Sequence, residues 1–331
     1  MLTRPEGGGL NFALMKVQSC SFAIALVFAA FNAAIQSPAK ADDFGSGTNA
    51  FSIDFVQISN TNNAANTNGY GAVPYEYRMG VYEISQANIT KATASGLANV
   101  TAGAWTGDQP AANITWYEAA AFVNWMNTSK GLQAAYNLSW SGSAWSMSLW
   151  SSTDAWTLGG TNLFRHKEAY YFLPSENEWY KAAYYNPAGT NYSLYPTASS
   201  TAPTAVASGT DANTAVYNSV ASSPAAVTNA GGLSFYGTMG QGGNVAEFTE
   251  SAFDGNNSSP TEFRAFRGGR YNAIASDMAN TSRGQIGPSQ EINTFGFHVA
   301  SIPEPSTYAL LLMAGAGALY ALKRRKSSNK D

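Results

Sequence analysis

Residues 240–251 have the sequence GQGGNVAEFTES, in which three glycines precede a run of apolar and polar residues. Its glycines at 242 and 243 predict a tight turn or a close approach of two backbone segments, because glycine accepts such conformations without strain. Two stretches of the same kind follow, FRAFRGGRYN at 263–272 and TFGFHVASI at 294–302, with glycines at 268, 269 and 296. The last third of the chain therefore carries its most specific sequence.

Strand patterns lie near the start of the body. FSIDFVQISN at 51–60 alternates apolar and polar residues, which predicts a half-buried strand. A second, aromatic-rich strand is expected around Tyr77–Ile84. Between Thr190 and Gly232 the composition shifts to Ala, Thr, Ser, Pro and Asn. Because apolar patterning resumes afterwards, this stretch is interpreted as long loops within one domain.

Two helices have clear start signals. Thr115 with Glu118, and Ser175 with Glu178, each have the spacing of a capping box. In the first helix, Trp116, Ala120, Val123 and Met126 or Asn127 are expected on one buried face. Pro187 and Gly189 are expected to end the second helix.

Taken together, six stretches resemble, in order, the sulfatase-modifying-factor family, also called the formylglycine-generating-enzyme-like domain. They are YEYRMGVYEIS (75–85), PAANITWYEAAAFVNWMN (110–127), YYFLPSENEWYKAAYY (170–185), GGNVAEF (242–248), FRGGRYN (266–272) and GFHVA (296–300). The resemblance implies an α+β domain over 42–301, distantly related to C-type lectins, with much irregular structure and few short helices. In the signature Gly-Asn-Val-Trp-Glu-Trp, Ala246 and Phe248 replace the two tryptophans.

The family's known chemistries need residues that this chain lacks. Sulfatase-activating members oxidise a cysteine with a cysteine pair that holds copper(I), a soft metal that favours thiolates. Cys20 is the only cysteine here, so no copper is expected. Related iron enzymes use a histidine cluster, and this chain has only His166 and His298. His298 replaces the family arginine and is expected to be a hydrogen-bonded core residue. We therefore expect no catalytic residue and no enzyme activity.

Calcium is the cofactor that the resemblance still allows, in a structural role. The residues matching the family's site are Gly242, Gly243, Val245 and Glu247, with Asn244 holding the loop in place. Calcium takes six to eight hard oxygen ligands, which carbonyls of a glycine-rich loop can supply. A weaker match places a second site at Asn213 and Thr214. The alternative is that Glu247 anchors the loop by binding backbone amides.

The N-terminal region has the pattern of a signal peptide over 1–41. A lysine precedes an apolar stretch, and Ala39-Lys40-Ala41 forms an A-x-A cleavage site. Met15 is an alternative start, since residues 1–14 add nothing that a signal needs. A buried helix or a membrane anchor is the other interpretation.

Residues 302–331 resemble the PEP-CTERM sorting signal of Gram-negative bacteria. Pro303, Glu304 and Pro305 precede an uncharged run at 308–322, which a basic cluster at 323–326 follows. The resemblance implies processing by an exosortase, after transient anchoring in the inner membrane by the run at 308–322, and delivery to the cell surface or extracellular matrix. A plain C-terminal anchor is the alternative.

Charge restricts the classes of partner. Between Asp42 and Ile302 there are 10 Lys/Arg and 18 Asp/Glu, a net of −8. Nucleic acid is not expected as a partner, because phosphate binding needs clustered basic residues. The expected partners are the export machinery, an exosortase-type enzyme and exopolysaccharide. The leading hypothesis is a non-catalytic surface or matrix protein with a binding or structural module; the alternatives are an active oxidoreductase of the family and a carbohydrate-binding module.

Overall fold

The computed structural model describes residues 39–101 and 103–303. The predicted sorting residues Ala39, Ala41 and Pro303 lie among them, whereas Glu304 and Pro305, the run at 308–322 and the predicted signal before Ala39 lie outside them. Within the described ranges no helix is long and apolar enough to cross a membrane.

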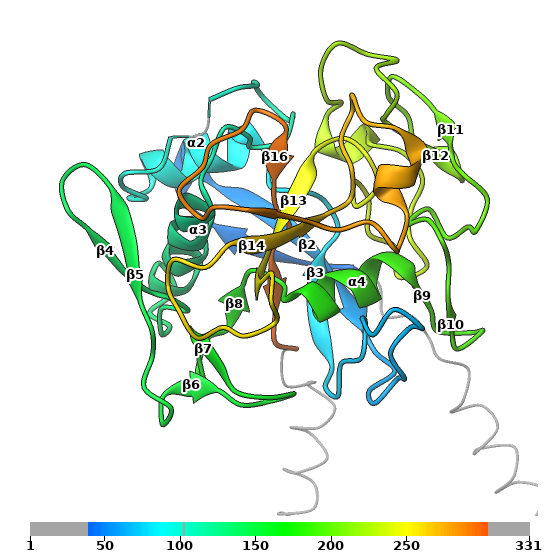
Figure 1. The fold of residues 1–331 in the computed structure, drawn as a ribbon. Helices are drawn as coiled ribbons and strands as arrows, with labels where there is room; N and C mark the ends of the chain where they lie inside the picture. Colours follow the sequence, from blue (N-terminus) through cyan, green and yellow to red (C-terminus); the bar gives the residue numbers. More distant parts are fainter. Residues whose placement is uncertain (1–38, 102, 304–331) are drawn as a thin grey trace, which may run out of the picture. The chain divides into compact units, whose positions relative to one another are not determined.

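A five-stranded sheet forms the centre of the domain, in the order β1-β2-β3-β17-β8 (Figure 1). Its strands are β1 (Lys40–Phe44), β2 (Phe51–Ile58), β3 (Tyr77–Gly80), β17 (Ala300–Ser301) and β8 (Tyr171–Phe172), and all neighbours in it are antiparallel. The strand predicted at 51–60 is confirmed as β2, in which buried and exposed positions alternate over its first half. The second strand is shorter than predicted. It ends at Gly80, where the chain leaves β2 and Gly80 donates to the Val299 carbonyl.

β1 bears on the predicted cleavage site. Ala41 lies in β1 opposite Asp54, and the next residue, Asp42, forms a buried ion pair with Arg78 at 2.6 Å. A mature chain beginning at Asp42 would keep this pair. Cleavage itself stays a prediction.

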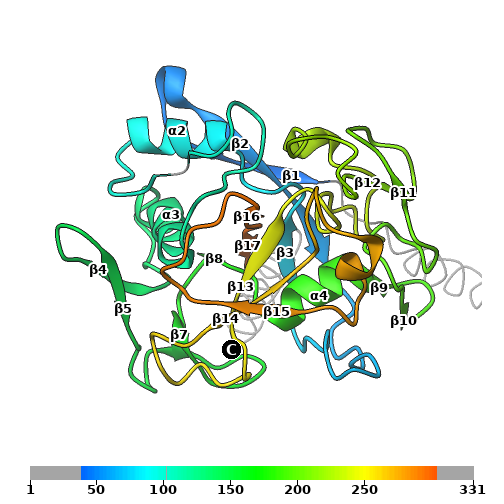
Figure 2. The ribbon, with the colours of Figure 1, turned by 45° about the horizontal axis from the view of Figure 1, so that its top comes forward.

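Three α-helices occur in the described residues: α2 (Gln86–Ala94), α3 (Trp116–Thr128) and α4 (Glu176–Tyr184). The capping boxes at Thr115 and Ser175 are confirmed. The residues expected on one buried face of α3 are all buried, and burial extends beyond that face to 11 of its 13 residues. α3 packs against β8, β5 and α2, so it is covered on more than one side (Figure 2).

Helix α4 ends at Tyr184, before the expected Pro187, because the chain turns there into the short strand β9 (Tyr185–Asn186). The loops predicted between 190 and 232 contain only two-residue strands and one 3₁₀ turn: β10 (Asn191–Tyr192), β11 (Thr204–Ala205), β12 (Thr214–Ala215) and η2 (Val227–Asn229). Two hairpins complete the middle of the chain: β4 (Asn137–Trp140) with β5 (Trp145–Ser148), and β6 (Ala155–Trp156) with β7 (Asn162–His166).

A second sheet carries the glycine-containing stretches of the last third of the chain. Its order is β15-β14-β13-β16, from β13 (Ala246–Ala252), β14 (Arg264–Arg267), β15 (Gly284–Ile286) and β16 (Phe295–Gly296). β13 pairs antiparallel with β14 and parallel with β16, and the short turn η3 (Ala275–Met278) lies between β14 and β15. The expected α+β fold, with few short helices and much irregular structure, is confirmed.

Candidate functional site

The loop before β13 is fixed by Asn244. This residue adopts a φ of 52°, a conformation in which asparagine is favoured. Its side-chain oxygen accepts from the Ala225 amide at 2.8 Å, and its amide group donates to Glu83 Oε2 at 2.5 Å. Gly243 must be glycine, because its φ is +82° and a Cβ would lie 2.3 Å from the Val216 carbonyl oxygen. The turn predicted at 242–244 is therefore present and tightly constrained.

Glu247, the predicted acidic calcium ligand, is fully buried in β13. Its Oε2 accepts from Trp179 Nε1 at 2.8 Å and lies 2.6 Å from His298 Nδ1. Among the described residues, Glu247 forms hydrogen bonds with these two side chains and with no backbone amide. The alternative, in which Glu247 anchors the loop by binding backbone amides, is therefore wrong. The interpretation of His298 as a hydrogen-bonded core residue is confirmed, since its Nε2 lies 3.1 Å from the Met239 carbonyl.

The two partners of His298 determine where protons lie. A carbonyl oxygen only accepts, so His298 Nε2 carries a proton and donates it to Met239. The 2.6 Å contact between Nδ1 and Glu247 Oε2 also contains a proton, as a charge-assisted hydrogen bond of that length requires. His298 is therefore engaged through both ring nitrogens.

Glu83 is a residue of this cluster that sequence reasoning missed. It is 2% exposed, and burial together with the nearby charge of Glu247 raises the pKa of its carboxyl well above the usual range. Its carboxylate lies so close to Gly240 that a Cβ there would be 2.9 Å away. The only sequence signal for it was an acidic residue in an otherwise apolar strand pattern.

Glu247 has one carboxylate oxygen that is available to a hard cation. Glu247 Oε1 is buried and has no hydrogen-bond partner in the described part of the chain. Gly243 forms a parallel bridge with Val216, and the Gly243 carbonyl accepts no hydrogen bond from residues 39–101 or 103–303. In the same ranges no three His, Cys, Asp or Glu side chains are placed to hold a metal ion, so a cation here would depend on backbone carbonyls.

The second predicted pair, Asn213 and Thr214, does not fit a cation. The Asn213 side-chain oxygen accepts from Thr197, and its backbone carbonyl accepts from Thr204. The Thr214 hydroxyl donates to the Asp211 carbonyl, and its own carbonyl accepts from Gly232. We therefore propose no metal at these two residues.

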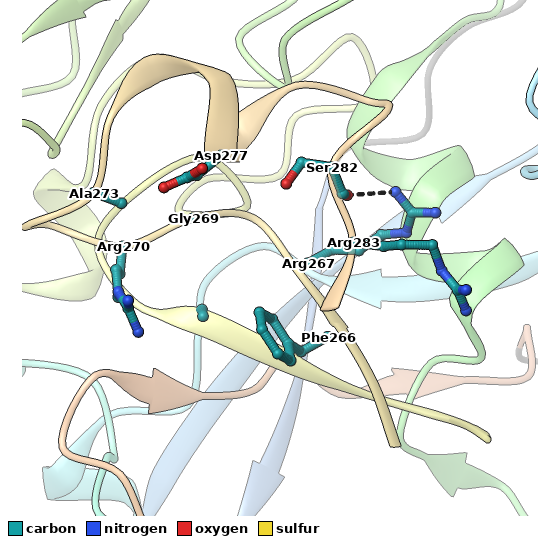
Figure 3. Close-up of a pocket in the computed structure, with 9 residues that line it drawn as sticks. Phe266, Arg267, Gly269, Arg270, Ala273, Asp277, Ser282 and Arg283 are labelled. Carbon is teal, nitrogen blue, oxygen red and sulfur yellow. Dashed lines mark hydrogen bonds between the residues drawn. The ribbon is translucent and has the colours of Figure 1, made fainter. Parts of the chain in front are cut away.

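A cavity of about 230 Å³ opens beside β13 and β14, and η3 and the two residues before β15 complete its wall (Figure 3). The residues of its wall used below are Ala246, Phe266, Arg270, Asp277, Ser282 and Arg283. None of them was predicted as a site residue.

Two of the arginines at the cavity are already paired. Arg267 Nε and Arg283 Nε lie 2.8 and 2.9 Å from Glu176 Oε1, and Arg283 Nη2 lies 2.8 Å from Glu176 Oε2. Arg267 also donates to the carbonyl of Ser282, which is the dashed contact in Figure 3. One buried carboxylate therefore serves two guanidinium groups.

Arg270 and Asp277 lack partners. Arg270 is half-buried, Asp277 is exposed, and neither side chain has a hydrogen bond or ion pair with any residue that the structure describes. In the view of Figure 3, Asp277 and Ser282 lie on one side of the cavity, while Arg270 and Phe266 lie on the other. Charged groups without partners at a cavity are available to a ligand.

The two histidines lie in separate networks. His166 is packed on the edge of Trp150, with ring centroids 4.6 Å apart, and its Nδ1 accepts from the Glu168 amide. His298 is held by Glu247 and Met239.

Comparison with known proteins identifies the family of this chain and structures with a similar fold. The profile of the family described as "Sulfatase-modifying factor enzyme 1-like domain" matches residues 36–302. Among solved structures, Treponema denticola variable protein 1 is similar, with 21% identity and a TM-score of 0.54, over 80% of this chain and 99% of that one. CarF is also similar, with 18% identity and a TM-score of 0.55, over 76% of this chain and 99% of its own. No curated protein matches this chain.

Proposed function

Because the chain belongs to the sulfatase-modifying factor enzyme 1-like domain family, we propose that it uses this fold without catalysis, as a binding module of an exported surface or matrix protein. The observation that carries the proposal is the cavity beside β13, in which Arg270 and Asp277 have no protein partner among the described residues. If Arg270 and Asp277 served only to stabilise the fold, we would expect them to form ion pairs within the chain, as Arg267 and Arg283 do with Glu176.

The residues available for the family's chemistries support the same proposal. Cys20 is the chain's single cysteine, so no cysteine pair can form within it. His298 is held at both nitrogens, and His166 lies in a different hydrogen-bond network. The rival function, an oxidoreductase of the family, would need another set of reactive groups.

Export and surface delivery belong to the proposal and rest on the sequence patterns at 1–41 and 302–331. The signal would bring the chain to the export machinery, and an exosortase-type enzyme would act on the C-terminal segment. Exopolysaccharide is the partner that such a location offers to a binding cavity.

A structural calcium ion is also part of the proposal. Glu247 Oε1 and the carbonyls of Gly242, Gly243 and Val245 would hold it, and it would fix the loop that precedes β13. The buried oxygen of Glu247 without a partner is the observation that supports it, because such an atom in a native protein is usually satisfied by an ion or a water molecule.

Two assays of the full-length chain, in mild detergent, separate binding from catalysis. A glycan array with and without calcium should show binding to a polysaccharide or its fragments. Incubation with a sulfatase-motif peptide, copper and oxygen should give no formylglycine by mass spectrometry. Formylglycine above the no-protein control, together with an array without binding, would establish the rival function.

A further inference from the structure

We infer that the cavity beside β13 binds the carboxylate of an acidic sugar residue, such as a uronic acid, with Arg270 as the residue that pairs with it. This inference rests on the proposed binding function and specifies the class of its ligand. It is argued from the charges, the residues across the cavity and the space that Ala246 leaves.

The cavity is a cationic region of an anionic domain. The body has a net charge of −8, yet three of its ten basic residues, Arg267, Arg270 and Arg283, line this cavity. Glu176, which pairs with two of them, and Asp277, which lines the cavity, bring the formal balance of these five residues to +1. The net positive charge of this group favours a small anion at this point of the surface.

Arg270 supplies the recognition. A guanidinium binds a carboxylate through two parallel hydrogen bonds, and such charge-assisted pairs are stronger than neutral ones. Arg267 cannot supply the same contact, because its Nε and Nη1 are used by Glu176 and by two backbone carbonyls. Arg270 has all of its donors free among the described residues.

Asp277 and Ser282 favour an acidic sugar over a tetrahedral anion as the ligand. Both are oxygen side chains on the wall of the same cavity, and neither has a side-chain partner in the described ranges. A carboxylate accepts hydrogen bonds from hydroxyl groups and repels a phosphate dianion more strongly than it repels a singly charged carboxylate. In a ligand with one carboxylate and several hydroxyls, the carboxylate pairs with Arg270 and the hydroxyls form hydrogen bonds with Asp277 and Ser282. Phe266 offers an apolar surface for the C–H face of a sugar ring.

Ala246 is the reason that there is room. It is 2% exposed, it lines the cavity, and it stands where the family signature has tryptophan. An indole at this position would extend into the space that the cavity occupies. The substitution that departs from the signature is therefore the one that opens the site.

The test is calorimetric titration of the full-length chain with oligogalacturonate at low salt. Arg270→Gln should weaken binding roughly ten- to a hundredfold, the loss expected for one charge-assisted pair. Arg270→Lys should retain part of the affinity. Lys167→Gln is the matched control, since it removes one positive charge from an exposed ion pair with Asp154 and should leave binding unchanged. Ala246→Trp should abolish binding while the protein still melts cooperatively.

Three other ligands separate the outcomes. The methyl ester of the same oligosaccharide lacks the charge and should bind at least tenfold more weakly. A sulfated neutral glucan and an unmodified neutral glucan should also bind more weakly. Preference for the sulfated or the neutral glucan, or an affinity that Arg270→Gln leaves intact, overturns the inference while the proposed binding function stands. If no glycan of any kind binds, the proposed function itself fails.

Discussion

Lys181 offers the sharpest test of the buried electrostatics. This residue of α4 is fully buried, and its ammonium has one hydrogen bond, to the Asn60 carbonyl at 3.0 Å. Burial lowers the pKa of Lys181 from 10.5 to about 8, and the charge of Glu76 offsets only part of that effect. The folded protein therefore holds this proton less tightly than the unfolded chain does.

The magnitude follows from the shift. Each pKa unit corresponds to about 1.36 kcal/mol, so the charged ammonium costs the folded state about 3 kcal/mol below pH 8. Between pH 8 and 10.5 the unfolded chain binds more protons than the folded one. The free energy of unfolding must therefore rise with pH in that window and be insensitive to Lys181 below it. Lys181→Met keeps the apolar stem, removes the charge and leaves the Asn60 carbonyl without its donor, at a cost of about 1 kcal/mol.

Urea unfolding at pH 7, 8, 9 and 9.5 measures this contribution as the difference between wild type and Lys181→Met. The variant should be more stable by about 2 kcal/mol at pH 7, and this advantage should shrink by about 2 kcal/mol by pH 9.5. Buried tyrosines such as Tyr184, whose pKa is also raised by burial, affect both proteins equally and cancel. A difference that does not change with pH, or a variant less stable at pH 7, would refute the reasoning.

Three further outcomes are expected. Chelation should lower the melting temperature of the wild type, and Glu247→Gln should remove most of the difference in melting temperature between calcium and chelator. Identical wild-type melting curves in the two buffers, with metal analysis showing that the ion was removed, would contradict the calcium site. Intact mass of the secreted protein should place its start near Asp42 and its end near residues 303–307, and a chain that keeps 308–322 in a strain with an active exosortase would contradict the sorting prediction. Arg165→Met should lower the free energy of unfolding by about 3–5 kcal/mol at pH 7, because it leaves buried Glu178 and Glu250 without their ion-pair partner. In urea titrations this loss of stability should become smaller towards pH 5, as the carboxylates gain protons. A loss that does not change with pH would show that lost packing dominates.

Local signals predicted the elements whose causes are local. The capping boxes at Thr115 and Ser175 and the alternation in β2 depend on residues within a few positions of each other, so the sequence reveals them directly. Helix α2 was not predicted, although Ser85 and Asn88 form its capping box, because asparagine at the third helical position is a weaker signal than glutamate.

The cavity beside β13 could not be predicted in the same way, because its features depend on distant pairs. Glu176 is 91 residues from Arg267 and 107 from Arg283, and this pairing is what distinguishes the engaged arginines from Arg270. In the sequence alone these arginines are equivalent. Glu83 is similarly far from its partner Asn244, at a separation of 161 residues, so its burial beside Glu247 follows only from the assembled fold.

The departures from the family signature differ in what they do to the structure. At 298, histidine replaces arginine and lies 2.6 Å from Glu247 Oε2, so the buried carboxylate has a partner at this position. At 248, phenylalanine replaces tryptophan and remains fully buried against Phe295, with ring centroids 5.7 Å apart. At 246, alanine replaces tryptophan and lines the cavity that Arg270 also lines. Random loss of an enzyme's function would leave its core signature eroded without regard to position. Here the positions 298 and 248 are hydrogen-bonded or packed in the core, whereas position 246 lies at the cavity, and this distribution is what the proposed binding function expects.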